Sequence, residues 1–137
     1  MKNKGNKSLP ITYDELVLGY EFPPASYELN SSVISKYLEA TGEQDSLTME
    51  FVPPLAIAAY TIAAMSGLFL LPPGVIHASQ DLEFLKLVPI GTKMECHNRV
   101  TQKLDRGKMH LLAIEFNVFD QDREKVLVGK ATLVLSD

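Results

Sequence analysis

An uncharged segment of 18 residues, from 54 to 71, constrains this chain more than any other feature of its sequence. Its length is near the lower limit for a helix that crosses a bilayer, about 17 residues. However, alanine, serine and glycine fill much of the segment, and no cluster of Lys or Arg flanks it. Small side chains let a sheet approach a helix closely, and the larger apolar ones supply packing volume. We therefore expect a core helix and no membrane insertion.

Proline and glycine mark both ends of this helix. Pro53 and Pro54 suit its first turn, where a missing N–H costs nothing. The Pro-Pro-Gly run at 72–74 prevents the helix from continuing. The sequence therefore predicts one helix over the whole of 54–71.

After this helix, apolar and polar residues alternate. Four runs follow with turn signals between them: 75–88, 92–104, 108–119 and a last run that ends at Leu135. A period of two predicts strands, and links this short imply antiparallel neighbours. In the first run, alternation predicts an apolar face with Ile76, Ala78, Leu82 and Phe84, and a polar face with His77, Ser79, Asp81 and Glu83.

The next two runs divide in the same way. In the second run, alternation predicts an inward face with Met94, Cys96, Val100 and Leu104, and a solvated face with Lys93, Glu95, His97, Arg99 and Lys103. In the third run, it predicts the inward residues Leu112, Ile114, Phe116 and Val118.

The N-terminal third supplies the remaining elements. We expect a flexible tail over 1–10, an extended stretch over 20–29, and a helix from about Ser32 to Thr41 that Ser31 or Ser32 caps. An apolar helix must be covered on most of its circumference, so the strands are expected to curl around it. The sequence thus predicts an α+β fold in one domain over 11–137: the hot-dog architecture, a long central helix wrapped by a curved antiparallel sheet.

Charge and cysteine content exclude several classes of function. A net charge of −4 and an isoelectric point near 5.3 give no sign of a basic face for nucleic acid. The single cysteine, Cys96, cannot form an internal disulfide, and no metal-ligand spacing is present. The polar N-terminus lacks the apolar segment of an export signal. We expect a cytoplasmic protein without a bound metal.

Several stretches together resemble the MaoC-like dehydratases, above all the N-terminal, fatty-acid-synthase-type branch. They are Tyr-Leu-Glu-Ala-Thr-Gly-Glu-Gln-Asp-Ser-Leu at 37–47, Val-Pro-Pro at 52–54, Gly-Val-Ile-His-Ala-Ser-Gln-Asp-Leu-Glu-Phe at 74–84 and Val-Pro-Ile-Gly-Thr at 88–92. The resemblance covers the chain from about residue 11 and rests on order and spacing. It implies a hot-dog homodimer, or a heterodimer with another hot-dog chain.

The resemblance also implies an acyl thioester substrate. The acyl chain would lie in a tunnel beside the central helix, with coenzyme A or acyl carrier protein at its mouth and no other cofactor. Under this interpretation the candidate substrate-binding residues are Pro54, Ala59, Ala63 and Phe84.

The implied reaction adds water reversibly to a 2-enoyl thioester, which requires two groups that transfer protons. Hydratases of this kind carry the pair in a Gly-Asp-x-Asn-Pro-x-His run. With Gly42 on the motif glycine, Glu43 falls on the aspartate, Asp45 on the asparagine, Ser46 on the proline and Thr48 on the histidine. Glu43 and Asp45 are thus candidate catalytic carboxylates, but threonine does not titrate near neutrality and cannot replace an imidazole.

The three histidines offer few alternatives. His77 is a further catalytic candidate, although alternation places it on the polar face unless a bulge reverses its strand. His97 is expected to be solvated and His110 half-buried, and Cys96 is expected to point inward as a small core residue.

Three hypotheses follow. The chain is a hydratase or dehydratase, a lyase, that uses Glu43 with an unusual partner; or it is a MaoC-like subunit without its own catalytic pair; or it is a hot-dog acyl-CoA thioesterase. A thioesterase generally needs an acid on or beside the central helix, and only Glu50 is close to it. The missing histidine favours the second hypothesis and leaves enzymatic activity open.

Overall fold

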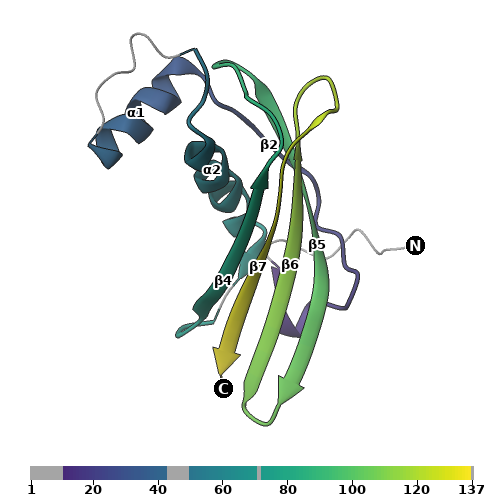
Figure 1. Cartoon of the computed structure of the whole chain (residues 1–137). Coiled ribbons are helices and arrows are strands. Elements are labelled where there is room, and N and C mark those ends of the chain that lie inside the picture. Colours follow the sequence, from purple (N-terminus) through teal and green to yellow (C-terminus); the bar gives the residue numbers. More distant parts are fainter. Residues whose placement is uncertain (1–10, 43–49, 71, 137) are drawn as a thin grey trace.

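A five-stranded antiparallel sheet with two helices on one side forms the body of the protein (Figure 1). This computed structural model describes residues 11–42, 50–70 and 72–136. The strands follow the order β2-β5-β6-β7-β4 across the sheet. The elements of this body are β2 (Ala25–Glu28), α1 (Ser31–Thr41), α2 (Pro54–Ser66), β4 (Ile76–Phe84), β5 (Lys93–Arg106), β6 (Met109–Phe119) and β7 (Lys125–Ser136). The α+β hot-dog architecture predicted from the sequence is thereby confirmed.

The central helix is shorter than predicted. α2 ends at Ser66, Gly67 follows, and the Leu68 N–H turns back to the Met65 carbonyl at 2.9 Å. The prediction of a helix up to residue 71 was wrong because the next residues form β3 (Phe69–Leu70), which pairs in parallel with β1 (Ile11–Thr12). Among the residues that the structure describes, no helix is long and apolar enough to span a membrane.

The first helix begins one residue earlier than predicted. The side chain of Asn30, and not of Ser31 or Ser32, accepts the Val33 N–H at 2.9 Å and caps α1. Asparagine is among the best residues at this position because its short side chain reaches the first-turn amides. At the other end, Gly42 has a φ of 85° and accepts the left-handed conformation that ends the helix.

Two β-bulges change which side chains face the helices. The register between β4 and β7 shifts between His77 and Ser79, and the register between β5 and β6 shifts between Val100 and Gln102. Each bulge adds one residue to its strand, so the alternation of faces reverses beyond it. His77 and Ile76 therefore exchange the faces that alternation predicted for them.

The same reversal occurs in β5. Lys103 lies opposite the buried Leu112 and points inward, whereas Leu104 lies opposite Leu111 on the outer face and is exposed. The inward Lys103 ammonium donates to the carbonyl oxygens of Tyr13, at 3.0 Å, and Leu16, at 2.7 Å. The alternation predicted from sequence was thus correct for Met94, Cys96 and Val100 and wrong for Leu104 and Lys103.

The core between sheet and helices is divided along the length of α2. One cluster joins Ala56, Ile57 and Ala58 of the first half of α2 to Leu127 and other sheet residues. A second cluster joins Met65, at the end of α2, to Leu133, Leu135 and residues of the N-terminal segment. The start of α2 therefore lies level with Leu127, and its end lies level with Leu133.

Candidate functional site

The loop between α1 and α2 carries most of the predicted catalytic residues. Glu43, Asp45, Ser46 and Thr48 lie outside the described residues, so the roles given to Glu43 and Asp45 stay predictions. The described chain resumes at Glu50, which is exposed.

Main-chain hydrogen bonds fix the start of α2 just after this loop. The Val52 N–H donates to the Val88 carbonyl at 2.7 Å, and the Ile90 N–H donates to the Glu50 carbonyl at 3.0 Å. Val52 is buried, and Pro54 then opens the helix with an exposed ring. The segment before β5 therefore holds the first turn of α2 in place from the side of the sheet.

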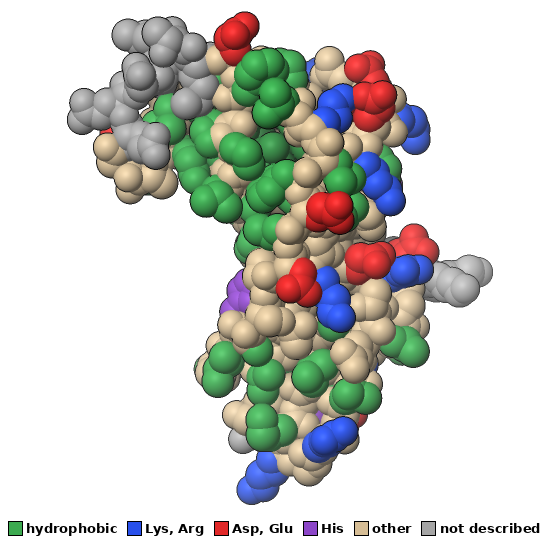
Figure 2. All heavy atoms as spheres, in the orientation of Figure 1, with side chains coloured by type: hydrophobic (Ala, Val, Ile, Leu, Met, Phe, Trp, Pro, Cys, Tyr) green, Lys and Arg blue, Asp and Glu red, His purple; other side chains and the backbone are tan. Residues whose placement is uncertain are grey.

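One face of α2 is buried and the other is not. Ala56, Ile57 and Thr61 are buried, whereas Ala59 and Ala63 are exposed and Leu55 keeps 62% of its surface. Apolar side chains gather over this part of the molecule, between α2 and the adjoining end of β4 (Figure 2). The predicted substrate-binding residues Pro54, Ala59 and Ala63 thus lie on an exposed, uncharged helix surface.

The bulge at Ala78 places His77 on the inner face of the sheet. His77 lies opposite Leu133, which is buried against the helix side, but the imidazole itself is exposed at the edge strand. Because Leu133 is level with the end of α2, His77 lies near that end as well. The helix has 13 residues and is about 20 Å long at 1.5 Å per residue, which separates His77 from the first turn.

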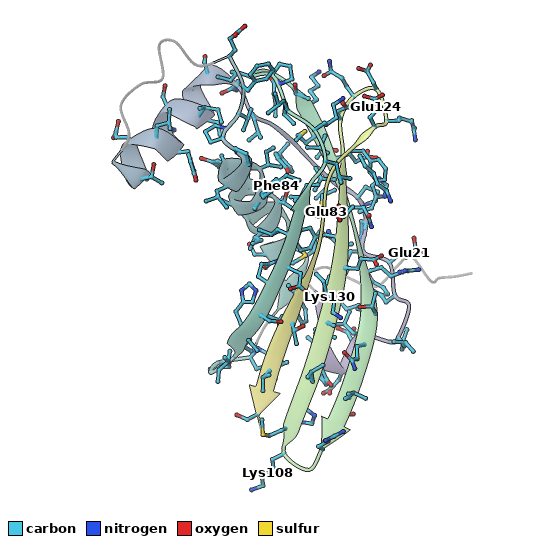
Figure 3. The ribbon with its side chains drawn as sticks, in the orientation of Figure 1. Glu21, Glu83, Phe84, Lys108, Glu124 and Lys130 are labelled. Carbon is cyan, nitrogen blue, oxygen red and sulfur yellow. The ribbon has the colours of Figure 1, made fainter. Side chains whose placement is uncertain are left out.

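Phe84 lies at the other end of β4. It is opposite Leu127, which is level with the start of α2, and Figure 3 labels it beside that helix. At about 3.3 Å per residue, Phe84 and His77 are about 23 Å apart along the strand. The structure therefore brings Phe84 close to the start of α2 and leaves His77 far from it.

Buried polar side chains between α2 and the sheet were missed in the sequence. The Tyr27 hydroxyl is hydrogen-bonded to the Thr61 hydroxyl, and the Cys96 thiol donates to the Asn98 side-chain oxygen at 3.1 Å. Asn98 is buried, and its side-chain nitrogen has no partner among the described residues. Asn98 occupies an inward position between Cys96 and Val100, so alternation was the signal that could have identified it.

Burial also raises the pKa of two of these groups, Cys96 and Tyr27. It raises the pKa of the Cys96 thiol to about 12, and the hydrogen bond to Asn98 offsets only part of this effect. Burial likewise raises the pKa of Tyr27 against the lowering effect of its bond to Thr61. Both groups stay protonated near neutral pH, and Cys96 is the inward core residue that the sequence predicted.

The outer face of the sheet is strongly charged. Neighbouring strands place charges of alternating sign side by side, and the Arg99 guanidinium donates to the Glu115 carboxylate at 3.2 Å. The row crosses the whole sheet through Glu21, Arg99, Glu115, Lys130 and Asp81. Figure 3 labels Glu21 and Lys130. Such a row is typical of a solvated face.

A hollow of about 860 Å³ also opens on this outer face. It lies between β2, β5 and β6 and is lined by His97, Phe119, Lys93 and Arg123 among others. His97 is exposed there, as predicted, and bonds to the Glu95 carboxylate at 2.7 Å. Of the predicted site residues that the structure describes, none lines this hollow, so it is separate from the surface beside α2.

His110 is half-buried, as predicted, and belongs to a hydrogen-bonded cluster with Asp105 and Tyr13. The Asp105 carboxylate accepts from the Tyr13 hydroxyl at 2.7 Å and lies 2.6 Å from the His110 ring nitrogen. These two neighbours, Tyr13 first, hold the pKa of Asp105 below its usual value. The cluster ties the N-terminal segment to β5 and β6 at the opposite end of the sheet from Phe84.

No family model and no curated protein matches the sequence of this chain. Solved structures do match its fold. An (R)-hydratase from Pseudomonas aeruginosa matches with a TM-score of 0.73 at 21% identity, over 91% of this chain and 88% of its own. A MaoC-like dehydratase from Rhodospirillum rubrum matches with a TM-score of 0.73 at 15% identity, over 92% and 97% of the two chains.

A subunit of a 3R-hydroxyacyl-ACP dehydratase complex from Mycobacterium tuberculosis, HadBC, is also similar. It matches with a TM-score of 0.69 at 14% identity, over 86% of this chain and 96% of its own. Identities this low establish the fold alone. The resemblance to the MaoC-like dehydratases is therefore confirmed at that level: this chain is a hot-dog protein with the fold of the MaoC-like dehydratases and (R)-hydratases.

Proposed function

We propose that this chain is an acyl-thioester-binding subunit of the (R)-specific hydratase or 3-hydroxyacyl dehydratase type that lacks a complete catalytic pair of its own. The observation that carries the proposal is the residue at position 48. Where the hydratase motif has its histidine, this chain has Thr48, whose hydroxyl cannot shuttle a proton near neutral pH.

The positions of the histidines support this proposal. His97 bonds to Glu95 on the outer face, and His110 belongs to the cluster with Asp105 and Tyr13. His77 lies on the inner face, but about 20 Å from the first turn of α2, which the loop with Glu43 precedes. A proton-transfer group must be within hydrogen-bond reach of the reacting atoms, so His77 is badly placed to replace the missing histidine.

The binding surface in this proposal lies beside α2. Phe84 and the exposed side of α2 present apolar surface, and α2 carries no charged residue. Apolar surface of this kind suits an acyl chain, because it is removed from water when the chain binds. The thioester would be carried on coenzyme A or acyl carrier protein, with no further cofactor.

Catalysis in this proposal depends on a second hot-dog chain. The similar dehydratase from Mycobacterium tuberculosis is a complex of such chains, which supports pairing here. A partner with the full motif would supply the missing imidazole for the complex, whereas this chain would bind the acyl tail.

Absorbance of a 2-enoyl thioester tests this proposal, because hydration removes the conjugated double bond and binding alone preserves it. We expect the purified chain to bind the thioester in calorimetry and to leave its absorbance unchanged. Hydration that Glu43→Gln abolishes would instead identify a complete enzyme with Glu43 as base. Release of the free thiol would identify the thioesterase of the third hypothesis.

A further inference from the structure

The two β-bulges of the sheet lie at the same level. Directly beside them, one residue from each of four strands lies opposite the next across the sheet: Ser79, Thr132, Ala113 and Gln102. Strands β4 and β5 therefore reverse their faces at one line, although they are separated by β6 and β7. The reversed half of the sheet lies next to the β5–β6 turn at residues 107–108.

This double reversal gathers apolar side chains on the outer face. Beyond the bulges, four outward residues lie opposite one another and form an apolar row across the strands: Ile76, Val134, Leu111 and Leu104. Ile76 is 62% exposed and Leu104 is 41% exposed, whereas the two residues between them are half-buried. Without the bulges, Ile76 and Leu104 would point inward, so the bulges create the row.

Only positive charge borders the apolar row on the side of the turn. Arg106 faces outward opposite Met109, and Figure 3 labels Lys108 at the turn itself. Both are exposed, and neither belongs to an ion pair among the described residues. Within the described strands, no Asp or Glu faces outward between the charged row and this turn. Figure 2 shows apolar side chains over this half of the outer face, with Lys and Arg side chains at its end.

The size of this surface limits what can bind there. Strands are about 4.8 Å apart, and outward residues follow each other about 6.6 Å apart along a strand. Four strands and three successive sets of outward residues therefore cover roughly 400 Å². A stable pair of proteins buries about 800 Å² on each partner, so this surface alone is too small to hold a second folded copy. Apolar patches of this size on a monomer are often functional.

A helix matches the apolar row in length and spacing. The first and last side chains of the row are three strand spacings apart, about 14 Å. On a helix, residues at i, i+4, i+7 and i+11 share one face and span about 16.5 Å. Four apolar residues of a three-turn helix can therefore each contact one of the four strands.

Charge indicates the composition of that helix and favours it over a lipid surface. A helix is about 10 Å wide, so along the apolar row one of its flanks reaches Arg106 and Lys108. The charged row is about 13 Å from the apolar row on the other side and stays uncovered. Acidic residues on the first flank would pair with the two cations. A flat anionic bilayer would instead also approach the carboxylates of Asp81 and Glu115 in the charged row.

We infer that the apolar row is the docking site for an amphipathic helix of a partner protein, which lies across the four strands and carries acidic residues on the flank that faces Arg106 and Lys108. The row is on the outer face of the sheet, whereas α2 covers the inner face (Figure 1). The docking site is therefore independent of the acyl-thioester site in the proposed function.

A synthetic helix tests this inference. The probe is a three-turn peptide with four leucines on one face and glutamates on one flank, and a side-chain staple holds it helical because short helices are marginal in water. In an NMR titration of the isotope-labelled chain, the amide shifts should centre on the apolar row. The same peptide with lysines in place of the glutamates should bind about tenfold more weakly, and the variant R106E/K108E should reverse this preference.

Two double variants of the chain form a matched pair. I76S/L104S removes both exposed ends of the apolar row and should weaken the acidic peptide by about tenfold or more. L85S/L87S removes two leucines of nearly equal exposure, 43% and 63%, that lie outside the row, and it should leave the affinity unchanged. Circular dichroism checks that both variants are folded. I76S/L104S should still bind the acyl thioester as the wild type does, so failure of the helix site and failure of the proposed function are distinguishable.

Three results would overturn the inference. An absence of amide shifts with the acidic peptide at millimolar concentration would exclude the helix. Binding to vesicles of phosphatidylcholine and phosphatidylglycerol that I76S/L104S abolishes would make the row a lipid-binding surface. A change of mass in light scattering with I76S/L104S, but not with L85S/L87S, would assign the row to a second copy of the chain.

Discussion

The ring of Phe116 lies over Gly129 on the neighbouring strand, so closely that a Cβ added at Gly129 would be 2.5 Å from it. Phe116 is completely buried in the cluster beside the first half of α2. The absence of a side chain on β7 at this position therefore makes room for the largest of the fully buried side chains.

We expect Gly129→Ala to lower the free energy of unfolding by about 1–3 kcal/mol, because the added methyl group overpacks the core. Urea denaturation measures this change. Gly67→Ala is the control, since its added Cβ would meet only the Ala64 carbonyl, at 4.0 Å, and should change stability little. When Phe116→Leu is also present, Gly129→Ala should lower the free energy of unfolding by less than it does in the wild type. An equal loss in both backgrounds would contradict the contact.

The Tyr27–Thr61 hydrogen bond links β2 to the middle of α2. Thr61→Val keeps the shape of the side chain but leaves the largely buried Tyr27 hydroxyl without this partner, and we expect a loss of about 1–3 kcal/mol in unfolding free energy. Tyr27→Phe in the Thr61→Val background should cost less than in the wild type. Additive losses in this double-mutant cycle would show that the two hydroxyls are not coupled.

The buried thiol of Cys96 should be unreactive in the folded protein. Its pKa is raised to about 12, so almost no thiolate, the reactive form, exists at pH 8. We expect negligible alkylation at pH 8 in native buffer and rapid alkylation in denaturant. Labelling of the native protein at the rate of a free thiol would contradict this burial.

The same raised pKa predicts a loss of stability in alkaline solution. The unfolded thiol titrates near pH 8.5, whereas the folded one resists ionisation until about pH 12. Its contribution to stability is therefore fully present below about pH 8 and decreases as the pH rises between these values. Between pH 8 and 10, Cys96→Ala should lose less stability than the wild type in urea denaturation, and equal losses would exclude Cys96 as the source.

Phenylalanine at Ala63 or Ala59 tests whether the exposed face of α2 binds the acyl chain. If it does, Ala63→Phe should reduce affinity for long acyl thioesters by tenfold or more and leave short ones nearly unaffected, because the ring fills part of the space for the chain. Calorimetry with a series of acyl lengths measures this change. Lys36→Ala is the control, because Lys36 is exposed on α1, and it should leave the affinities unchanged. An unchanged length preference would remove these two positions from the binding site.

The general architecture could be predicted because it depends on long, regular patterns. The uncharged run at 54–71 indicated the central helix, and the alternation over Leu112–Val118 indicated a strand with one buried face, as observed. Such patterns average over many residues and tolerate local exceptions.

The predicted side-chain orientations were wrong where a β-bulge inserted one extra residue into a strand. The bulge at His77–Ser79 turned His77 inward, and the bulge at Val100–Gln102 did the same for Lys103. Nothing in a period of two signals an inserted residue, because the bulge is stabilised by contacts with distant strands. For Lys103 these contacts are the carbonyl groups of Tyr13 and Leu16, about 90 positions earlier in the chain.

The end of α2 illustrates the same limit. Residues 69 and 70 are apolar and could continue a helix, but they pair with Ile11 and Thr12, which are distant in sequence. For the loop between α1 and α2, the sequence provided the whole argument, because Glu43, Asp45 and Thr48 lie outside the described residues.

The parallel pair of β1 and β3 joins residues that are 58 positions apart, Ile11 and Phe69. Bringing such distant segments together costs more loop entropy than pairing β5 with β6, which are joined by a two-residue turn at Gly107–Lys108. We expect the β5–β6 hairpin to form early in folding and the N-terminal segment to dock late. Pulsed hydrogen exchange should then show protection at Ile114 before Ile11. The N-terminal segment would then dock onto an assembled sheet, so a stretch that is synthesised before β5 and β6 would become ordered after them.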